Sequence, residues 1–408
     1  MRDTGSLIRI SALLAAALML AGTALRAQQM PETPEAATQL EAHDALPRTS
    51  FYEAPLLTAS KPGDLLRQAL ATDFALPPGA RALRILYHSL DAEGHAVASS
   101  AVVVLPAGKP PAGGWPVIAW AHGTSGVARQ CAPSLMKDLY YGDEGLYEMV
   151  RGGFAIVAAD YHGLGTAGPH QYVDKIAQTH DVIYSIPAAR RAVPELGSRW
   201  VADGHSQGGL ATWGVAEAET EHPDPGFLGA ISVAGATRLE ELLTHLGSTP
   251  GVSFYMAFMT YGVKARFPEF QPMDMLSERA MALYPQATSN GCWYYGYALY
   301  RTTPPSSMLK PGWTANPWVR KWFAENETGE RAIKVPLFVI AGEADQSVPI
   351  GAVRATVERA CKLGGPINFR TYPGLDHDPT MEKSTPDQLA WARDRFAGRP
   401  VVPDCPRR

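Results

Sequence analysis

A serine flanked by glycines stands in residues 201–209, which read Val-Ala-Asp-Gly-His-Ser-Gln-Gly-Gly. Gly204 and Gly208 frame Ser206 in the pattern G-x-S-x-G, which is typical of a nucleophile held where a strand turns sharply into a helix. The glycines permit this turn because Cβ atoms at their positions would collide with the neighbouring strand and helix. The hydroxyl would then lie at the positive end of a helix. An ordinary Gly-rich turn gives the same pattern, so nucleophilic chemistry at Ser206 requires partners elsewhere in the chain.

The first partner is a base, since a serine hydroxyl is a poor nucleophile until its proton is removed. The histidines that follow Ser206 are His222, His245 and His377. His222 comes just after the predicted nucleophile helix, and His245 lies within another predicted helix. His377 follows the strand-like residues 367–372 and a Pro-Gly turn. A loop at the carboxyl end of a late strand can reach the serine, so we expect His377 to be the base.

The second partner is an acid that orients the imidazole and balances its charge. Asp345 stands in the loop after the apolar residues 335–341, at the carboxyl end of the preceding strand. Glu343 and Asp376 are alternatives. Asp376 adjoins the histidine, and sequence neighbours seldom face each other. We therefore expect Asp345 to be the acid.

An ester or amide reaction at Ser206 also needs two donors for the oxyanion. The backbone N–H of Gln207, the residue after the nucleophile, is one. The other should come from residues 122–126, His-Gly-Thr-Ser-Gly, which follow the apolar residues 115–121. Thr124 is the expected donor, although Gly123 or Ser125 could present an N–H instead, and these residues could also merely close the strand.

Five apolar runs alternate with helical stretches and predict the scaffold that positions these residues. The runs are residues 115–121, 154–159, 200–203, 231–234 and 335–341, and the clearest helical stretches are 173–193 and 209–219. Such alternation predicts a parallel sheet with helices on both faces. Residues 81–90 and 96–105 add a β-hairpin. Asp160, at the end of the second run, is expected to order its loop rather than to act in catalysis.

Residues 251–325 interrupt this alternation of strands and helices, and they contain nearly half of the aromatic side chains of the chain. A small helical unit with its own core would account for them. A cap that walls an apolar pocket over Ser206 would account for them as well. We expect both to hold, with a mainly helical cap (lid) inserted at residues 237–334.

The first 27 residues resemble a secretory signal peptide. Arg2 and Arg9 give a positive end, residues 10–25 an apolar run, and Ala27 a small residue for cleavage. The run is too short and too rich in alanine to favour a stable membrane span. We expect a secreted or periplasmic protein, with a flexible leader over residues 28–60.

Composition and cysteine content fit an exported globular protein. Hydrophobic residues make up 46% and charged residues 19% of the 408 residues, and the net charge is −4. Lysines and arginines form no stripe, so we expect no nucleic-acid partner. The cysteines are even in number and lack C-x-x-C spacing, which favours two disulfides over a zinc site and leaves three pairings open. They are Cys131, Cys292, Cys361 and Cys405.

Across roughly residues 80–405, the chain resembles the secretory lipase family, of the lipase A type. The motifs that carry the resemblance are His122-Gly123-Thr124, Cys131-Ala132-Pro133-Ser134, Gly204-His205-Ser206-Gln207-Gly208, Gly342-Glu343-Ala344-Asp345 and Asp376-His377. The resemblance implies an α/β-hydrolase fold: a mostly parallel central sheet flanked by helices, formed by residues 61–236 and 335–408, with the cap inserted between them. It also implies the disulfides Cys131–Cys292 and Cys361–Cys405.

Together these features predict a serine carboxylic-ester hydrolase, a lipase or esterase, that acts through an acyl-serine without metal or cofactor. Its partner would be a small-molecule ester or a lipid, and its oligomeric state is open. An amidase or peptidase that uses the same residues is an alternative. A non-catalytic binding protein with a hydrolase-like fold is another, although the intact serine, acid and histidine argue against it.

Overall fold

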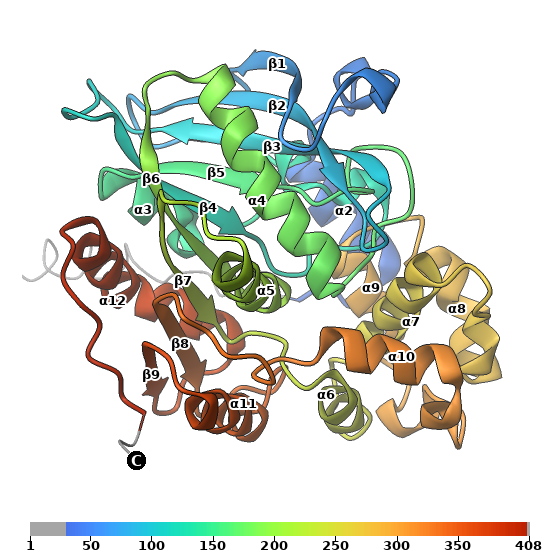
Figure 1. Ribbon diagram of the computed structural model, residues 1–408. Helices are drawn as coiled ribbons and strands as arrows, with labels where there is room; N and C mark the ends of the chain where they lie inside the picture. Colours follow the sequence, from blue (N-terminus) through green and yellow to red (C-terminus); the bar gives the residue numbers. More distant parts are fainter. Residues whose placement is uncertain (1–29, 406–408) are drawn as a thin grey trace, which may run out of the picture.

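A single twisted sheet forms the centre of the molecule, as the computed structural model of residues 30–405 shows (Figure 1). Its order is β1-β2-β3-β5-β4-β6-β7-β8-β9. The strands from β5 to β9 pair in parallel, whereas β1, β2 and β3 pair antiparallel and β3 joins β5 antiparallel. The predicted mostly parallel sheet is therefore confirmed. The strands are β1 (Leu65–Ala71), β2 (Arg81–Leu90), β3 (Ala96–Leu105), β4 (Trp115–Ala121), β5 (Ala155–Ala159), β6 (Leu196–His205), β7 (Phe227–Val233), β8 (Leu337–Gly342) and β9 (Ile367–Tyr372).

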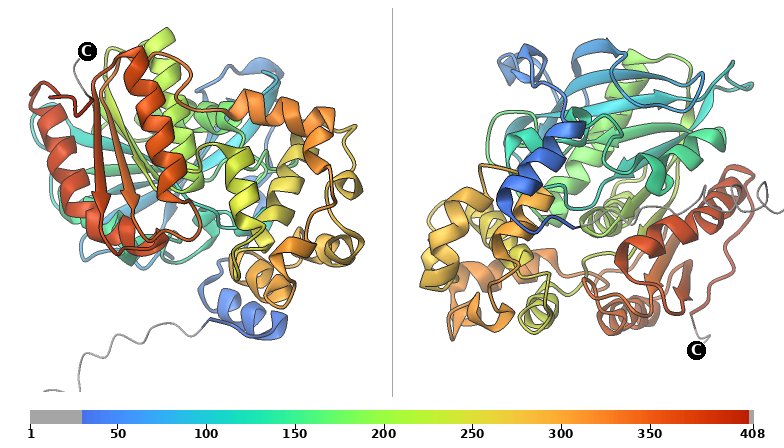
Figure 2. Two further views of the ribbon diagram at one scale, coloured as in Figure 1. Left: turned by 90° about the horizontal axis from the view of Figure 1, so that it is seen from below. Right: turned by 180° about the vertical axis from the view of Figure 1, so that it is seen from behind.

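Helices cover both faces of this sheet. Val117 and Ala119 of β4 point to the face covered by α4, α5 and α11, and Ile118 and Trp120 point to the face covered by α3 and α12. This alternation explains why the central strands are apolar throughout. In the left view of Figure 2, the last strands stand between α11 and α12. These helices are α3 (Tyr147–Arg151), α4 (Lys175–Ala192), α5 (Gln207–Glu221), α11 (Ile350–Leu363) and α12 (His377–Phe396).

The antiparallel end of the sheet contains one strand that the sequence pattern did not predict. The hairpin β2–β3 has the predicted bounds and closes between Leu90 and Ala96. Strand β1 pairs with β2 at the edge, although its sequence, Leu-Leu-Arg-Gln-Ala-Leu-Ala, contains no β-branched residue and is rich in helix formers. Pairing with β2 overrides this local preference.

The prediction of a flexible leader over residues 28–60 is wrong for most of that range. Helix α2 (Pro34–Asp44) begins after the N-cap Thr33 and packs against α9 (Trp293–Tyr300). Short 3-10 turns follow at Ser50–Tyr52 and Leu57–Ala59. The carboxylate of Glu41 accepts the backbone N–H groups of Cys292 and Tyr295, at 2.9 and 2.8 Å. The polar composition of residues 28–60 suggested mobility. In the structure, however, the carboxylate of Glu41 binds a part of the chain that is distant in sequence. The predicted signal peptide, residues 1–27, lies outside the described residues.

The chain between β7 and β8 forms a helical insertion. Its helices are α6 (Leu239–Leu246), α7 (Phe254–Arg266), α8 (Glu278–Ala287), α9 (Trp293–Tyr300) and α10 (Pro317–Asn326). Within this insertion the structure has an isolated β-bridge, Leu276 to Leu309, and no strand. Among residues 30–405, none of the helices is long and apolar enough to cross a lipid bilayer.

Buried charges attach this insertion to the sheet domain. Arg266 of α7 lies 3.3 Å from the carboxylate of Asp174, the N-cap of α4, and 3.0 Å from that of Glu325 in α10. It also contacts Glu93 in the turn between β2 and β3. Only 8% of the side chain of Arg266 is exposed. Separating the insertion from the sheet domain would therefore leave buried charges of this cluster without partners.

Both disulfides form with the pairing that the family resemblance implies. Cys131, in the loop after β4, bonds to Cys292 at the start of α9, and Cys361 of α11 bonds to Cys405 near the end of the chain. The first disulfide therefore joins the insertion to the segment that follows β4. The second joins α11 to the residues after α12.

We predict that loss of the first disulfide destabilises the fold more than loss of the second. The bonds close loops of 161 and 44 residues. Loop-closure entropy sets upper limits of about 5 and about 4 kcal/mol on their contributions to the free energy of unfolding. The measurement is urea unfolding of Cys131→Ser/Cys292→Ser and, as the matched control, Cys361→Ser/Cys405→Ser. Unchanged stability in the first double variant would contradict the prediction.

Candidate active site

Ser206 occupies the sharp turn between β6 and α5. Its backbone has φ 59° and ψ −116°, a conformation that non-glycine residues rarely adopt. A Cβ at Gly204 would lie 2.5 Å from the carbonyl oxygen of Gly208, and a Cβ at Gly208 would overlap the carbonyl oxygen of Ala121 in β4. Only glycine fits at both positions, and this close packing holds the serine in its strained conformation.

The structure brings Ser206, His377 and Asp345 together at the carboxyl ends of β6, β9 and β8. His377 Nε2 lies 2.8 Å from Ser206 Oγ, and His377 Nδ1 lies 2.8 Å from Asp345 Oδ2. The other oxygen of Asp345 accepts the backbone N–H groups of Ser347 and Val348, at 2.9 and 2.7 Å. The carboxylate is thus fixed on one side and free to hold the imidazole on the other.

The two alternative acids have other partners. Glu343 accepts a hydrogen bond from the Thr371 hydroxyl at 2.7 Å. Asp376 is the N-cap of α12, and its Oδ1 accepts the backbone N–H groups of His377 and Gln346, both at 2.8 Å. Asp376 therefore positions the histidine through the backbone, whereas Asp345 contacts the ring.

The two alternative histidines lie away from the serine hydroxyl. His222 ends α5 as its C-cap. His245 of α6 lies with Nε2 2.8 Å from the carbonyl oxygen of Gln346, in the loop that holds Asp345. Neither forms a hydrogen bond to Ser206 among the described residues.

The environment of His377 favours its protonated form. The side chain is 7% exposed, and burial alone would lower the pKa of the imidazole. The charge of Asp345 and its hydrogen bond to the ring raise the pKa, and together with the charges of Asp378 and Asp376 they outweigh burial. The pKa of His377 is therefore raised from its ordinary value of 6.5 to about 9, so the imidazolium that forms when the ring takes a proton is stabilised.

The backbone N–H groups of Gln207 and Thr124 have no acceptor among residues 30–405, and the same is true of the N–H groups of Gly123 and Ser125. Gln207 is the first residue of α5, and it lines a small cavity together with Thr124 and Ser206. Thr124 is held from two sides, since its hydroxyl lies 2.6 Å from the Tyr172 hydroxyl and its carbonyl oxygen accepts the Tyr140 hydroxyl at 2.7 Å. The oxyanion role of Thr124 and Gln207 stays a prediction.

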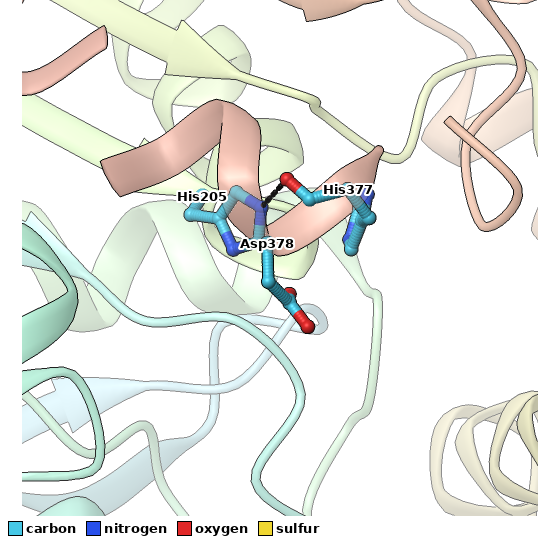
Figure 3. A group of neighbouring side chains, drawn as sticks. All are labelled: His205, His377 and Asp378. Atoms are coloured by element: carbon cyan, nitrogen blue, oxygen red, sulfur yellow. Dashed lines mark hydrogen bonds between the residues drawn. The ribbon is translucent and has the colours of Figure 1, made fainter. Parts of the chain in front are cut away.

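A second histidine, His205, lies next to His377, and its contacts were not predicted from the sequence. His205 Nε2 donates to the carbonyl oxygen of His377 at 3.3 Å, and the two rings lie 4.5 Å apart (Figure 3). Its Nδ1 accepts the Tyr141 hydroxyl at 3.0 Å. Burial keeps the pKa of His205 well below its ordinary value, so the ring is neutral. The sequence feature that could have pointed to His205 is its position directly before the serine in the pattern G-x-S-x-G.

The same two histidines and the carboxylate of Asp378 are close enough to hold a metal ion. Both ring nitrogens of His205, however, are hydrogen-bonded within the protein, as are both of His377. We therefore assign no metal to this group. Asp378 acts on His377 through its charge.

Asp160 orders a loop, as the sequence analysis expected. Its carboxylate is buried and accepts the backbone N–H of Ser134 at 2.8 Å and the hydroxyl of Ser100 at 2.6 Å. These bonds join the middle of β3 and the end of β5 to the segment that contains Cys131.

Two cavities meet at Ser206. The outer cavity, of about 370 Å³, is walled by α2, the loop around Tyr140 and the start of α9. The inner cavity, of about 20 Å³, extends toward α6 and α7 of the insertion. Carboxylates of Glu41, Asp44, Asp138, Glu144 and Asp378 line the outer cavity, and no Lys or Arg stands among its described lining residues.

Comparisons with known proteins agree on one family. The sequence pattern of the family described as secretory lipase matches residues 141–404. Lipase 4 of Candida albicans is 26% identical over 273 residues, which cover 62% of this chain and 58% of the relative. Lipase 5 of the same organism is 24% identical over 268 residues, which cover 62% of this chain and 57% of the relative. The chain thus spans less than three fifths of the length of these relatives.

Two solved structures are similar in fold. Candida antarctica lipase A in its closed state superposes with a TM-score of 0.74 at 18% identity, over 88% of this chain and 89% of the other. The rice cell wall degrading esterase LipA from Xanthomonas oryzae superposes with a TM-score of 0.69 at 18% identity, over 83% of this chain and 99% of the other. The fold is therefore that of the α/β-hydrolases, as predicted.

We predict that Asp345→Asn lowers the pKa of His377 by more than about one pH unit, because the main charge that stabilises the imidazolium is lost while burial remains. NMR titration of the imidazole measures this shift. Asp376→Asn is the control, since asparagine still caps α12 and the charge of Asp376 contributes least. An unchanged pKa in Asp345→Asn would contradict the assignment of Asp345.

Proposed function

Because the chain belongs to the secretory lipase family, we propose that it hydrolyses carboxylic esters through an acyl-serine intermediate. One observation carries the proposal: the continuous hydrogen bonding from Ser206 Oγ through His377 to Asp345, with 2.8 Å at each step. A serine, a base in contact with it and a third group that orients the base are the requirements for nucleophilic acyl transfer.

In the acylation step, Ser206 Oγ attacks the carbonyl carbon of the ester while His377 Nε2 takes the hydroxyl proton. The electron pair of the carbonyl moves to its oxygen, and the N–H groups of Gln207 and Thr124 stabilise the resulting oxyanion. Collapse of this intermediate re-forms the carbonyl and breaks the bond to the alcohol. His377 then donates its proton to the leaving alkoxide, and the acyl group remains on Ser206.

Deacylation repeats these steps with water. His377 takes a proton from a water molecule, the hydroxide adds to the acyl carbon, and the second collapse expels Ser206 Oγ. The proton returns to the serine, and the carboxylic acid leaves. The carboxylate of Asp345 stabilises the imidazolium in both steps. The raised pKa of His377 favours this imidazolium.

We also propose that the protein acts outside the cytoplasm. The family is described as secretory, both disulfides suit an oxidising compartment, and residues 1–27 have the pattern of a signal peptide.

We predict that Ser206→Ala reduces kcat for an activated ester by about a million-fold, the loss that removal of the nucleophile causes in another serine hydrolase. Hydrolysis of nitrophenyl acetate measures the change, and circular dichroism checks the fold. The control is Ser232→Ala on β7, a buried serine whose hydroxyl donates to the Gly209 carbonyl rather than to a histidine.

A fluorophosphonate probe separates a catalytic protein from a non-catalytic one. We expect mass spectrometry to find the added mass of the probe on the peptide that contains Ser206. Labelling of another residue, or near-normal activity in Ser206→Ala, would contradict the assignment of Ser206 as the nucleophile. Comparison of a nitrophenyl ester with the matching nitroanilide tests the ester preference. Faster turnover of the anilide would favour an amidase that uses the same residues.

We predict that the exported protein begins directly after Ala27. N-terminal sequencing of the chain recovered from the periplasm or the medium measures the processing site. A chain that stays in the cytosol with residues 1–27 attached and its cysteines reduced would contradict the proposed location.

A further inference from the structure

The outer and inner cavities share three lining residues, Thr124, Ser206 and Tyr255. They differ in the catalytic groups that reach them. His377 lines the outer cavity and is absent from the lining of the inner one, whereas Gln207 lines the inner cavity and is absent from the lining of the outer one. The two sides of Ser206 are therefore chemically distinct.

This difference fixes the orientation of an ester. The leaving alkoxide must receive its proton from His377 Nε2, so the alcohol portion has to lie on the side that His377 faces. The acyl portion then lies on the opposite side, next to Gln207. We propose that the site takes esters of short acyl groups, with the acyl group in the inner cavity and a bulky alcohol group in the outer cavity. The inference rests on the proposed function.

The inner cavity limits the acyl group by its size. A cavity that holds one water-sized group needs about 10–15 Å³, so the 20 Å³ here accommodate little more than the methyl group of an acetyl ester. Leu242 and Leu246 of α6, Met259 of α7 and Val348 form its apolar walls, and each is at most 3% exposed. Side chains this closely packed resist displacement by a longer chain.

The outer cavity suits a larger and more polar group. Its volume of about 370 Å³ exceeds that of the inner cavity by more than tenfold. Aromatic rings of Tyr140, Trp293 and Tyr294 line it beside the carboxylates already described. Such a wall offers faces for stacking and acceptors for hydroxyl groups.

Two isomeric esters test the orientation directly. Octyl acetate and ethyl octanoate have the same formula and differ only in which side of the ester carries the long chain. We expect kcat/KM for octyl acetate to exceed that for ethyl octanoate by tenfold or more. Equal values, or a preference for ethyl octanoate, would overturn the inference and leave the proposed function intact. If neither isomer nor nitrophenyl acetate is hydrolysed, the proposed function fails and the inference falls with it.

Enlarging the inner cavity tests its role. Leu246→Ala should raise the ratio of kcat/KM for nitrophenyl butyrate to that for nitrophenyl acetate by about tenfold, the effect of a methylene in an apolar pocket. The matched control is Leu243→Ala, a buried leucine of the same helix that does not line either cavity. Both substrates are measured on the same preparation of each variant, so the ratio does not depend on the fraction of the protein that is folded.

Met259→Ala enlarges the same cavity from α7 and should shift the ratio in the same direction. A ratio that stays unchanged in both Leu246→Ala and Met259→Ala, or one that rises equally in Leu243→Ala, would overturn the assignment of the inner cavity to the acyl group.

Discussion

The contact between the backbone of β4 and the turn at Ser206 is the constraint on which the site depends. Strand β6 and helix α5 approach β4 so closely that Gly204 and Gly208 have no room for a side chain. This packing holds Ser206 at a positive φ that the free chain would avoid. Because β4, β6, β8 and β9 are parallel neighbours or near neighbours in one sheet, the same edge also receives Thr124, Asp345 and His377.

Fixed backbone groups hold the reactive side chains in place. The N–H groups of Ser347 and Val348 hold Asp345, and the carboxylate of Asp376 caps α12 where His377 begins it. His205 supports the same residue from below through its carbonyl oxygen. Each reactive group thus has a second contact that determines its orientation before any substrate arrives, which is the preorganisation that acyl transfer requires.

The sequence predicted the parts of this structure that depend on local pattern. Apolar runs located the buried strands, and a chain order of serine, acid and histidine selected Ser206, Asp345 and His377, which the structure places within hydrogen-bond distance. It did not predict β1 or α2, because β1 depends on pairing with β2 and α2 depends on contacts with α9. The walls of both cavities also come from segments far apart in the chain, and no local pattern encodes that convergence.

One consequence concerns how a substrate reaches the serine. The helical insertion is anchored covalently at Cys292 and electrostatically at Arg266, so a rigid swing away from the sheet would break a bond or leave charges buried alone. Helix α2 is attached beside the outer cavity through the part-buried carboxylate of Glu41 and through Ala37, which packs with Tyr295 and Ala298 of α9. Among the described residues, neither a disulfide nor an ion pair joins α2 to the sheet or to the insertion. This wall of the outer cavity can therefore shift without breaking a covalent bond or separating an ion pair, whereas the insertion cannot.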